Sequence, residues 1–133
     1  MEKVMKLLKE NTVMNLATCC NDKPRSSIME YIMIDGKMII ATDPESIKGK
    51  NLSKNPRVSL TVGGMPTFMA IDGTVEDASP KETEEYNKIL FERYPHFKEP
   101  MTSGMIVFKH FRVVFDTAYY SDGMGPAAVI KMK

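Results

Sequence analysis

The sequence has no tryptophan, only two cysteines and only two histidines among its 133 residues. None of its apolar runs approaches the roughly 20 residues that a membrane-spanning helix needs. Its charges nearly cancel, with a formal net charge of +1, whereas proteins that bind duplex nucleic acid usually carry a positive surplus or a dense basic face. We therefore expect neither a membrane nor a nucleic-acid partner. Residues 1–11 also lack the apolar run and cleavage site of a signal peptide, which predicts a cytoplasmic protein.

The two cysteines, Cys19 and Cys20, are neighbours in the chain. Successive residues of an extended strand point to opposite faces, so an unstrained disulfide between them is not expected. Neither His96 nor His110 stands at a spacing from them that is typical of a metal site. We predict free thiols, at least half-buried, and no metal.

Familiar catalytic and nucleotide-binding motifs are also missing. The sequence contains no nucleophile elbow, no Walker sequence and no dinucleotide-binding glycine motif. It is, however, 43% hydrophobic with 12 methionines, which is enough for a packed core. The length predicts one domain, residues 1–133.

Short β-rich segments separated by turn sequences predict a mainly β fold. Expected strands cover 12–19, 25–34, 37–42, 57–62, 67–77 and 104–117, and expected helices cover 1–10, 47–54 and about 80–93. About six antiparallel strands with helices between them are typical of a β-barrel with peripheral helices. An open sheet with helices on one side is the alternative, and we favour closure because it removes exposed edges.

Two helix starts carry capping signals. Ser79, followed by Pro80 and three residues later by Glu82, predicts a capping box. The earlier helix has two possible caps, Asp43 and Ser46. We favour Asp43, because Pro44 would then occupy the first helical position.

One constellation of side chains suits a phosphate group. Asp35-Gly36 predicts a hairpin, in which Arg25 at the start of one strand would lie beside Thr42 at the end of the next. Ser46 and Lys48 follow directly. Two cations, several hydroxyls and the free N–H groups of a helix N-terminus could together bind a phosphate monoester. The alternative is a solvated basic face made of Lys48, Lys50, Lys54 and Arg57.

The same segments resemble a known family. Residues 25–29, 40–42 and 46–48, followed by Asn51-Leu52 and by the run 55–60 (Asn-Pro-Arg-Val-Ser-Leu), are similar to the pyridoxamine 5′-phosphate oxidase-related flavoproteins. These proteins are FMN-binding split β-barrels. The likeness is strongest over residues 24–62.

The resemblance implies FMN as cofactor and assigns roles to eight residues. Arg25, Ser46 and Lys48 would hold the FMN phosphate, and Thr42 would contact the phosphate or the flavin edge. The backbone of four consecutive residues would line the isoalloxazine ring: Ser26, Ser27, Ile28 and Met29. The resemblance further implies a homodimer with FMN at the subunit interface, and an oxidoreductase of unknown substrate.

The chain departs from the true oxidase at several positions. Glu30 replaces a lysine, Ile47 replaces an arginine, and a glutamine of the oxidase falls near Phe68. Residues 119–133 have no counterpart of the oxidase's C-terminal substrate motif. The resemblance therefore does not extend to pyridoxamine phosphate oxidation. Glu30 is either an outward-facing strand carboxylate or a negative charge near the flavin, where it would disfavour the anionic reduced form.

Three other functions stay open at this stage. The same site could belong to a non-enzymatic flavin carrier or electron-transfer module. A related split barrel could bind deazaflavin or haem, for which His96 or His110 would be the available ligands. The third possibility is a cofactor-free barrel that acts as an interaction protein.

Overall fold

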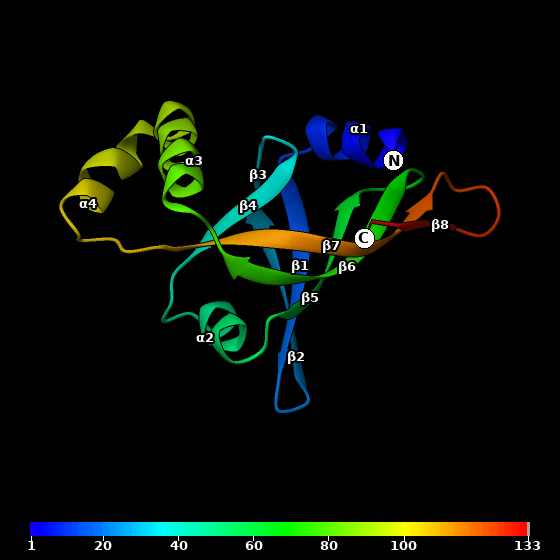
Figure 1. Ribbon diagram of the computed structural model, residues 1–133, viewed down its shortest axis with the longest axis horizontal. Coiled ribbons are helices and arrows are strands. Elements are labelled where there is room, and N and C mark those ends of the chain that lie inside the picture. Colours follow the sequence, from blue (N-terminus) through cyan, green and yellow to red (C-terminus); the bar gives the residue numbers. More distant parts are fainter. Residues whose placement is uncertain (133) are drawn as a thin grey trace.

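The computed structural model describes residues 1–132, and eight strands and five helical segments lie within them (Figure 1). The strands are β1 (Val13–Cys20), β2 (Lys23–Glu30), β3 (Ile32–Ile34), β4 (Lys37–Thr42), β5 (Arg57–Gly63), β6 (Phe68–Asp77), β7 (Lys109–Ser121) and β8 (Ala128–Lys131). The helical segments are α1 (Glu2–Glu10), α2 (Ile47–Lys54), α3 (Pro80–Arg93), the short 3₁₀ turn η1 (Pro95–Phe97) and α4 (Lys98–Thr102). The predicted mainly β fold with peripheral helices is confirmed. None of the described helices combines the length and apolarity needed to cross a membrane.

The strands form one antiparallel sheet that curls into a half-barrel. Its order is β2-β1-β5-β6-β7-β4-β3, and β8 pairs with β7 outside this path. β2 and β3 are the first and last strands of this order, and only one residue, Tyr31, separates them along the chain. The two edges of the sheet therefore come together at Tyr31. The Tyr31 backbone N–H donates to Thr12 at 3.0 Å, and its hydroxyl donates to the Leu8 carbonyl of α1 at 2.7 Å. These bonds hold the bend against the rest of the molecule.

The predicted second strand, 25–34, is wrong as a single element. Tyr31 divides it, and the Asp35-Gly36 hairpin joins only β3 to β4. Arg25 lies opposite Thr18 in the β1–β2 pair. The expected strand neighbours Arg25 and Thr42 therefore do not pair, and β2 keeps a free edge because it pairs with β1 alone.

The C-terminal third also differs from the expected strands. The last long strand begins at Lys109 rather than at residue 104, and the side chain of Met105 is 82% exposed. A further strand, β8, follows the expected last strand and adds to the edge of β7. Both this extra strand and the division at Tyr31 raise the count above the six expected.

Two apolar clusters place α3 against the sheet. The larger one fills the half-barrel and includes Met38 and Ile40 of β4. Ile39, between them, points to the other face and packs with Tyr86 and Leu90 of α3. β4 is thus buried on both faces, because the barrel interior lies on one side and α3 on the other.

The start of α3 is anchored by charge. Its capping box is present as predicted, with Ser79 Oγ accepting from the Glu82 backbone and Glu82 accepting from the Ser79 backbone. The Arg112 guanidinium of β7 donates to both Glu82 carboxylate oxygens, at 2.8–3.1 Å, and also pairs with Glu76. Chiefly through the Arg112 hydrogen bonds, the pKa of Glu82 falls to about 2. This bidentate pair ties α3 to the sheet.

We expect the Glu82 charge to stabilise the fold in a defined pH window. Because its pKa is lowered on folding, its contribution is complete above about pH 4.5 and is lost as the pH falls towards 2. Glu82→Gln keeps an acceptor for the cap but removes the charge. Melting temperatures followed by circular dichroism should therefore lie below wild type at pH 7, with the gap closing as the pH falls through that window.

Glu84→Gln is the matched control, because Glu84 is exposed on the same helix. It should leave the melting temperature unchanged across the range. A Glu82→Gln deficit that is equal at pH 7 and pH 2.5 would show that the charge is not the cause.

Candidate functional site

The N-terminus of α2 is built around Ser46. Its Oγ accepts from the Gly49 backbone N–H at 3.0 Å and donates to the Asp43 carbonyl at 2.7 Å. The expected Asp43 cap is therefore wrong: the Asp43 carboxylate instead accepts from the Glu45 backbone N–H at 2.9 Å, which turns the chain before the helix begins. Thr42 is buried, and its Oγ1 lies 3.4 Å from Ser46 Oγ. The buried Thr42 side chain thus lies against the Ser46 hydroxyl that caps α2.

The approach of this turn to the helix requires a glycine. A Cβ at Gly49 would lie 2.2 Å from the Asp43 carbonyl oxygen, so any larger residue would displace the backbone. The turn and the first helical turn are held together by this contact and by the Ser46 cap. The position of Lys48, one residue before Gly49, is fixed with them.

Two asparagines dock α2 on the sheet. Asn51 Nδ2 donates to Thr18 Oγ1 at 3.1 Å, and Asn55 Nδ2 donates to the Cys19 carbonyl at 3.1 Å. Both acceptors belong to β1, which lies between β2 and β5 in the sheet. The two asparagines of the sequence run therefore have a structural role, which is to set α2 beside the β1–β2 hairpin.

β2 offers a free backbone edge beside α2. It pairs with β1 alone, in a register that places Cys20 opposite Lys23 across a two-residue turn. The residues that flank such a turn exchange hydrogen bonds, so alternate residues from Lys23 onward bond to β1. The backbone groups of Ser26 and Ile28 consequently face away from β1. The Ile28 side chain is 74% exposed.

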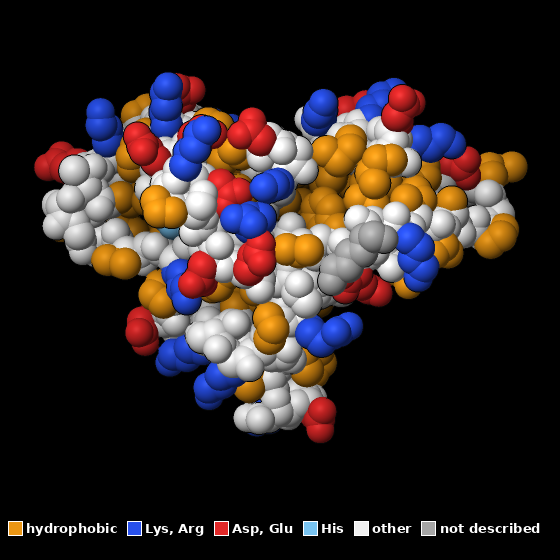
Figure 2. Space-filling view, viewed as in Figure 1, with side chains coloured by type: hydrophobic (Ala, Val, Ile, Leu, Met, Phe, Trp, Pro, Cys, Tyr) orange, Lys and Arg blue, Asp and Glu red, His pale blue; other side chains and the backbone are white. Residues whose placement is uncertain are grey.

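A cationic groove lies between the hairpin and α2. Its volume is about 430 Å³, and Arg25, Ile47 and Asn51 are among its lining residues. Three lysines also line the groove: Lys23, Lys50 and Lys54. None of its described lining residues is acidic. Lysine and arginine side chains are visible around α2 in the lower part of Figure 2. Arg25 thus meets the first turn of α2 across this groove, although not through the hairpin that the sequence suggested.

Lys48 lies on the next cavity, at the far end of β2. This second cavity has a volume of about 300 Å³ and brings Lys48 together with Met29 and Glu30 of β2 and Ala41 of β4. Adjacent residues of α2, Ile47 and Lys48, therefore each line one of two cavities. Of the eight residues singled out from the sequence, Arg25 lines the groove, whereas Lys48 and Met29 line the second cavity. Thr42 adjoins Ser46, and Ser26, Ser27 and Ile28 lie on β2 between the two cavities.

Sequence reasoning missed the aromatic wall of the second cavity. Tyr86 and Tyr94, together with Phe97 and Phe108, line it opposite β2. The Tyr94 hydroxyl donates to the Glu30 carboxylate. This bond raises the pKa of Tyr94, and burial raises the pKa of Tyr86 to about 12. Glu30, Met29 and Lys48 are the residues singled out from the sequence that line this cavity.

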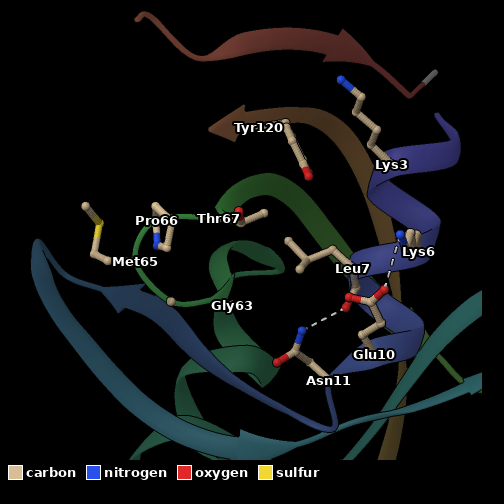
Figure 3. A pocket seen from close by; sticks show the side chains of 11 residues that line it. Lys3, Lys6, Leu7, Glu10, Asn11, Gly63, Met65, Pro66, Thr67 and Tyr120 are labelled. Carbon is tan, nitrogen blue, oxygen red and sulfur yellow. Dashed lines mark hydrogen bonds and ion pairs between the residues drawn. The ribbon is translucent and has the colours of Figure 1, made fainter. Parts of the chain in front are cut away.

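A larger cavity, of about 530 Å³, lies away from α2, between α1, the β5–β6 turn and β7 (Figure 3). Its polar groups largely satisfy one another: Lys6 pairs with Glu10 at 3.7 Å, and Asn11 Nδ2 donates to the Leu7 carbonyl at 2.9 Å. None of the eight residues singled out from the sequence lines it. We therefore place the candidate site at α2 rather than in the larger space.

The cysteines and histidines occupy supporting positions. Cys19 and Cys20 are free and half-buried, as predicted. His110 is half-buried, with Nε2 2.9 Å from Asn87 Oδ1, and burial lowers its pKa. His96 is exposed in η1.

Comparison with known proteins decides the family. The sequence matches the model of the pyridoxamine 5′-phosphate oxidase family over residues 1–121. The chain belongs to the pyridoxamine 5′-phosphate oxidase family. This confirms the family that residues 24–62 suggested.

One relative from this family is the pyridoxine/pyridoxamine 5′-phosphate oxidase of Ehrlichia ruminantium. The two are 34% identical over 82 residues, which is 59% of this chain and 42% of the relative. The chain spans less than half the length of the curated relatives that it matches.

Solved structures share the split-barrel fold of this family. A FAD-binding protein from Mesorhizobium loti superposes with a TM-score of 0.66 at 22% identity, covering 85% of this chain and 87% of that one. A heme binding protein from Mycobacterium smegmatis superposes with a TM-score of 0.76 at 16% identity, covering 98% of this chain and 57% of that one. At these identities the likeness shows a common fold.

We expect Ser46→Ala to lower the free energy of unfolding by about 1 kcal/mol, because the Gly49 N–H loses its acceptor at the start of α2. Urea denaturation measures the change. Ser53→Ala is the control within the same helix, since the Ser53 hydroxyl only donates to carbonyls of that helix, at 3.0 and 3.3 Å. An equal decrease in the free energy of unfolding of the two variants would show that the Ser46 cap contributes no more than the Ser53 hydroxyl.

Proposed function

We propose that this chain is an FMN-binding flavoprotein and an oxidoreductase, with the phosphate of FMN held at the start of α2. The observation that carries the proposal is the position of Arg25 across an acid-free groove from the first turn of α2. A phosphate monoester carries nearly two negative charges at neutral pH, and Arg25 and Lys48 would neutralise them. The same residues are those that resemble the phosphate ligands of related flavoproteins.

The residues around α2 fit the two ends of FMN. Ser46 presents a hydroxyl at the helix N-terminus, where the helix dipole also favours an anion. From Arg25, the edge of β2 extends for roughly 17 Å to Glu30, at about 3.4 Å per residue. The outward amide and carbonyl groups of Ser26 and Ile28 are suited to the hydrogen-bonding edge of a flavin ring. The phosphate and ring would thus be held by one continuous surface.

The protein's own contribution to the reaction is positioning. When bound, the flavin supplies hydride or electron transfer. Arg25, Ser46 and Lys48 would fix the phosphate end, Thr42 would hold Ser46 in place, and backbone groups of β2 would orient the ring. No side chain of this site is required to move a proton under this proposal.

A second copy of the chain would complete the site. Two large apolar side chains beside it are exposed, with Ile28 at 74% and Ile47 at 54%. A partner subunit would cover both and shield the flavin from water. We therefore propose a homodimer with FMN at the interface, which sedimentation of the loaded protein would reveal as twice the mass of one chain.

We expect Arg25→Ala and Lys48→Ala each to weaken FMN binding by about 10- to 150-fold, corresponding to about 1.5–3 kcal/mol for a charge-assisted hydrogen bond. Quenching of flavin fluorescence during titration of FMN-free protein measures the dissociation constant. Lys37→Ala removes an exposed cation of the β3–β4 hairpin and is expected to leave binding unchanged.

The visible spectrum of the purified protein separates the competing functions. Bands near those of free FMN support the proposal, whereas a Soret band would favour haem. A colourless protein that does not take up FMN would favour an interaction protein. Tight FMN binding without turnover of any nicotinamide donor would favour a flavin carrier. Unchanged affinity in both site variants would place the phosphate elsewhere.

A further inference from the structure

The cavity between α1, the β5–β6 turn and β7 has the size of a small-molecule site. Its volume is about 530 Å³, within the range that such sites occupy. It lies beside α1, whose Val4 and Leu8 belong to the core of the half-barrel, and the mouths of β-barrels are common places for ligands. None of its described lining residues comes from α2 or β2. A ligand held here would therefore be separate from the flavin.

Three elements fix the walls of this cavity. Tyr120 projects from β7 at a position where β7 is paired on both sides, with β6 and with β8. The Gly64 N–H donates to the Thr67 carbonyl at 3.2 Å and closes the β5–β6 turn. A Cβ at Gly63 would lie 2.7 Å from the Thr67 carbonyl oxygen and 3.5 Å from Leu7 Cδ1, so the turn passes close to α1. The cavity is thus largely pre-formed.

One charge of the cavity has no counterpart. Glu10 is the acidic group among the described lining residues, and it pairs with Lys6 at 3.7 Å. Lys3 lines the same space but takes part in none of the ion pairs among residues 1–132. Its Nζ lies over the Tyr120 ring, 5.8 Å from the centroid. The cavity therefore keeps one uncompensated positive charge, which favours an anion.

Two hydroxyl groups border the same space. Neither the Tyr120 hydroxyl nor the Thr67 hydroxyl has a hydrogen-bond partner among residues 1–132. Figure 3 shows Tyr120 directed into the cavity from β7, and Thr67 at its edge on the β5–β6 turn. The Lys3 ammonium has three N–H donors, of which the Tyr120 ring occupies one side. The ammonium and the two hydroxyls together suit the oxygens of a carboxylate.

The rest of the lining is suited to an apolar ring. Leu7, Met65, Pro66 and the Tyr120 ring supply it. Leu7 is only 8% exposed, whereas Met65 is 82% exposed, so the cavity is closed towards α1 and open at the turn. Flat aromatic groups pack well against ring faces and edges such as that of Tyr120.

We propose that this cavity is a second ligand site, and that it binds an aromatic carboxylate. The carboxylate pairs with Lys3 and accepts hydrogen bonds from the Tyr120 and Thr67 hydroxyls, while the ring lies against Leu7 and Pro66. A single unpaired cation suits a carboxylate, which carries one negative charge, better than a phosphate monoester, which carries nearly two. The site does not depend on the proposed flavin site, because the two share no lining residue.

Three naphthalene compounds, substituted at the same ring position, test the charge preference. Naphthoate, naphthamide and naphthylmethylammonium are each titrated into isotope-labelled protein, with and without FMN, and amide chemical shifts are recorded by NMR. We expect naphthoate to bind about tenfold more tightly than naphthamide, and the ammonium compound to bind least. The shifts should centre on Lys3, Thr67 and Tyr120, and the affinity for naphthoate should be the same with and without FMN.

Lys3→Met removes the charge and keeps most of the length of the side chain. It should weaken naphthoate binding about tenfold and abolish its advantage over naphthamide. Tyr120→Phe keeps the ring and should weaken naphthoate binding about three- to tenfold through loss of the hydroxyl. Lys9→Met is the matched control, because Lys9 is exposed on α1 and does not line the cavity. It should change neither affinity.

Four outcomes would overturn the proposal. They are no binding of naphthoate, equal binding of naphthoate and naphthamide, an unaltered preference in Lys3→Met, and shifts centred on α2 in place of α1. Displacement of naphthoate by FMN would also overturn it, since naphthoate would then occupy the flavin site.

Discussion

Two side-chain hydrogen bonds, from Asn51 and Asn55 of α2 to β1, determine where the candidate site can form. They hold a short helix beside the hairpin whose outer strand, β2, has a free edge. The Ser46 cap and the close approach at Gly49 then fix the first turn of that helix. Arg25 of β2 faces α2 across the groove because of this docking rather than because of any strand pairing. A charged site is thus built on a small set of neutral bonds, which do not weaken with salt as surface ion pairs do.

The surface along β2 divides by charge and chemistry. At the Arg25 end the groove is cationic and free of acids among its described residues, which suits an anion. At the Glu30 end the cavity is largely aromatic, and the Glu30 carboxylate accepts a hydrogen bond from the Tyr94 hydroxyl. Arg112 and Glu82 contribute indirectly, because they anchor α3 and hence the wall that carries Tyr86 and Leu90.

Much of this architecture could be predicted from the sequence because its signals are local. The capping box at Ser79, the hairpin at Asp35-Gly36 and the alternating strands depend on residues only a few positions apart. The break at Tyr31 could not be predicted, since it depends on bonds to Thr12 and Leu8 across the fold. The choice of Ser46 over Asp43 as cap reversed a local preference, because Asp43 turns the preceding backbone. The contact between Glu30 and Tyr94 joins residues 64 positions apart, and strand periodicity carries no trace of it.

The most direct test of the central claim is a crystal structure of the protein grown with FMN. The account predicts the phosphate at the start of α2, with its oxygens within hydrogen-bond distance of the Arg25 guanidinium, the Ser46 hydroxyl and Lys48 Nζ, and with the flavin ring along the edge of β2. A phosphate bound in the cavity between α1 and the β5–β6 turn, or one that contacts neither Arg25 nor Lys48, would contradict it.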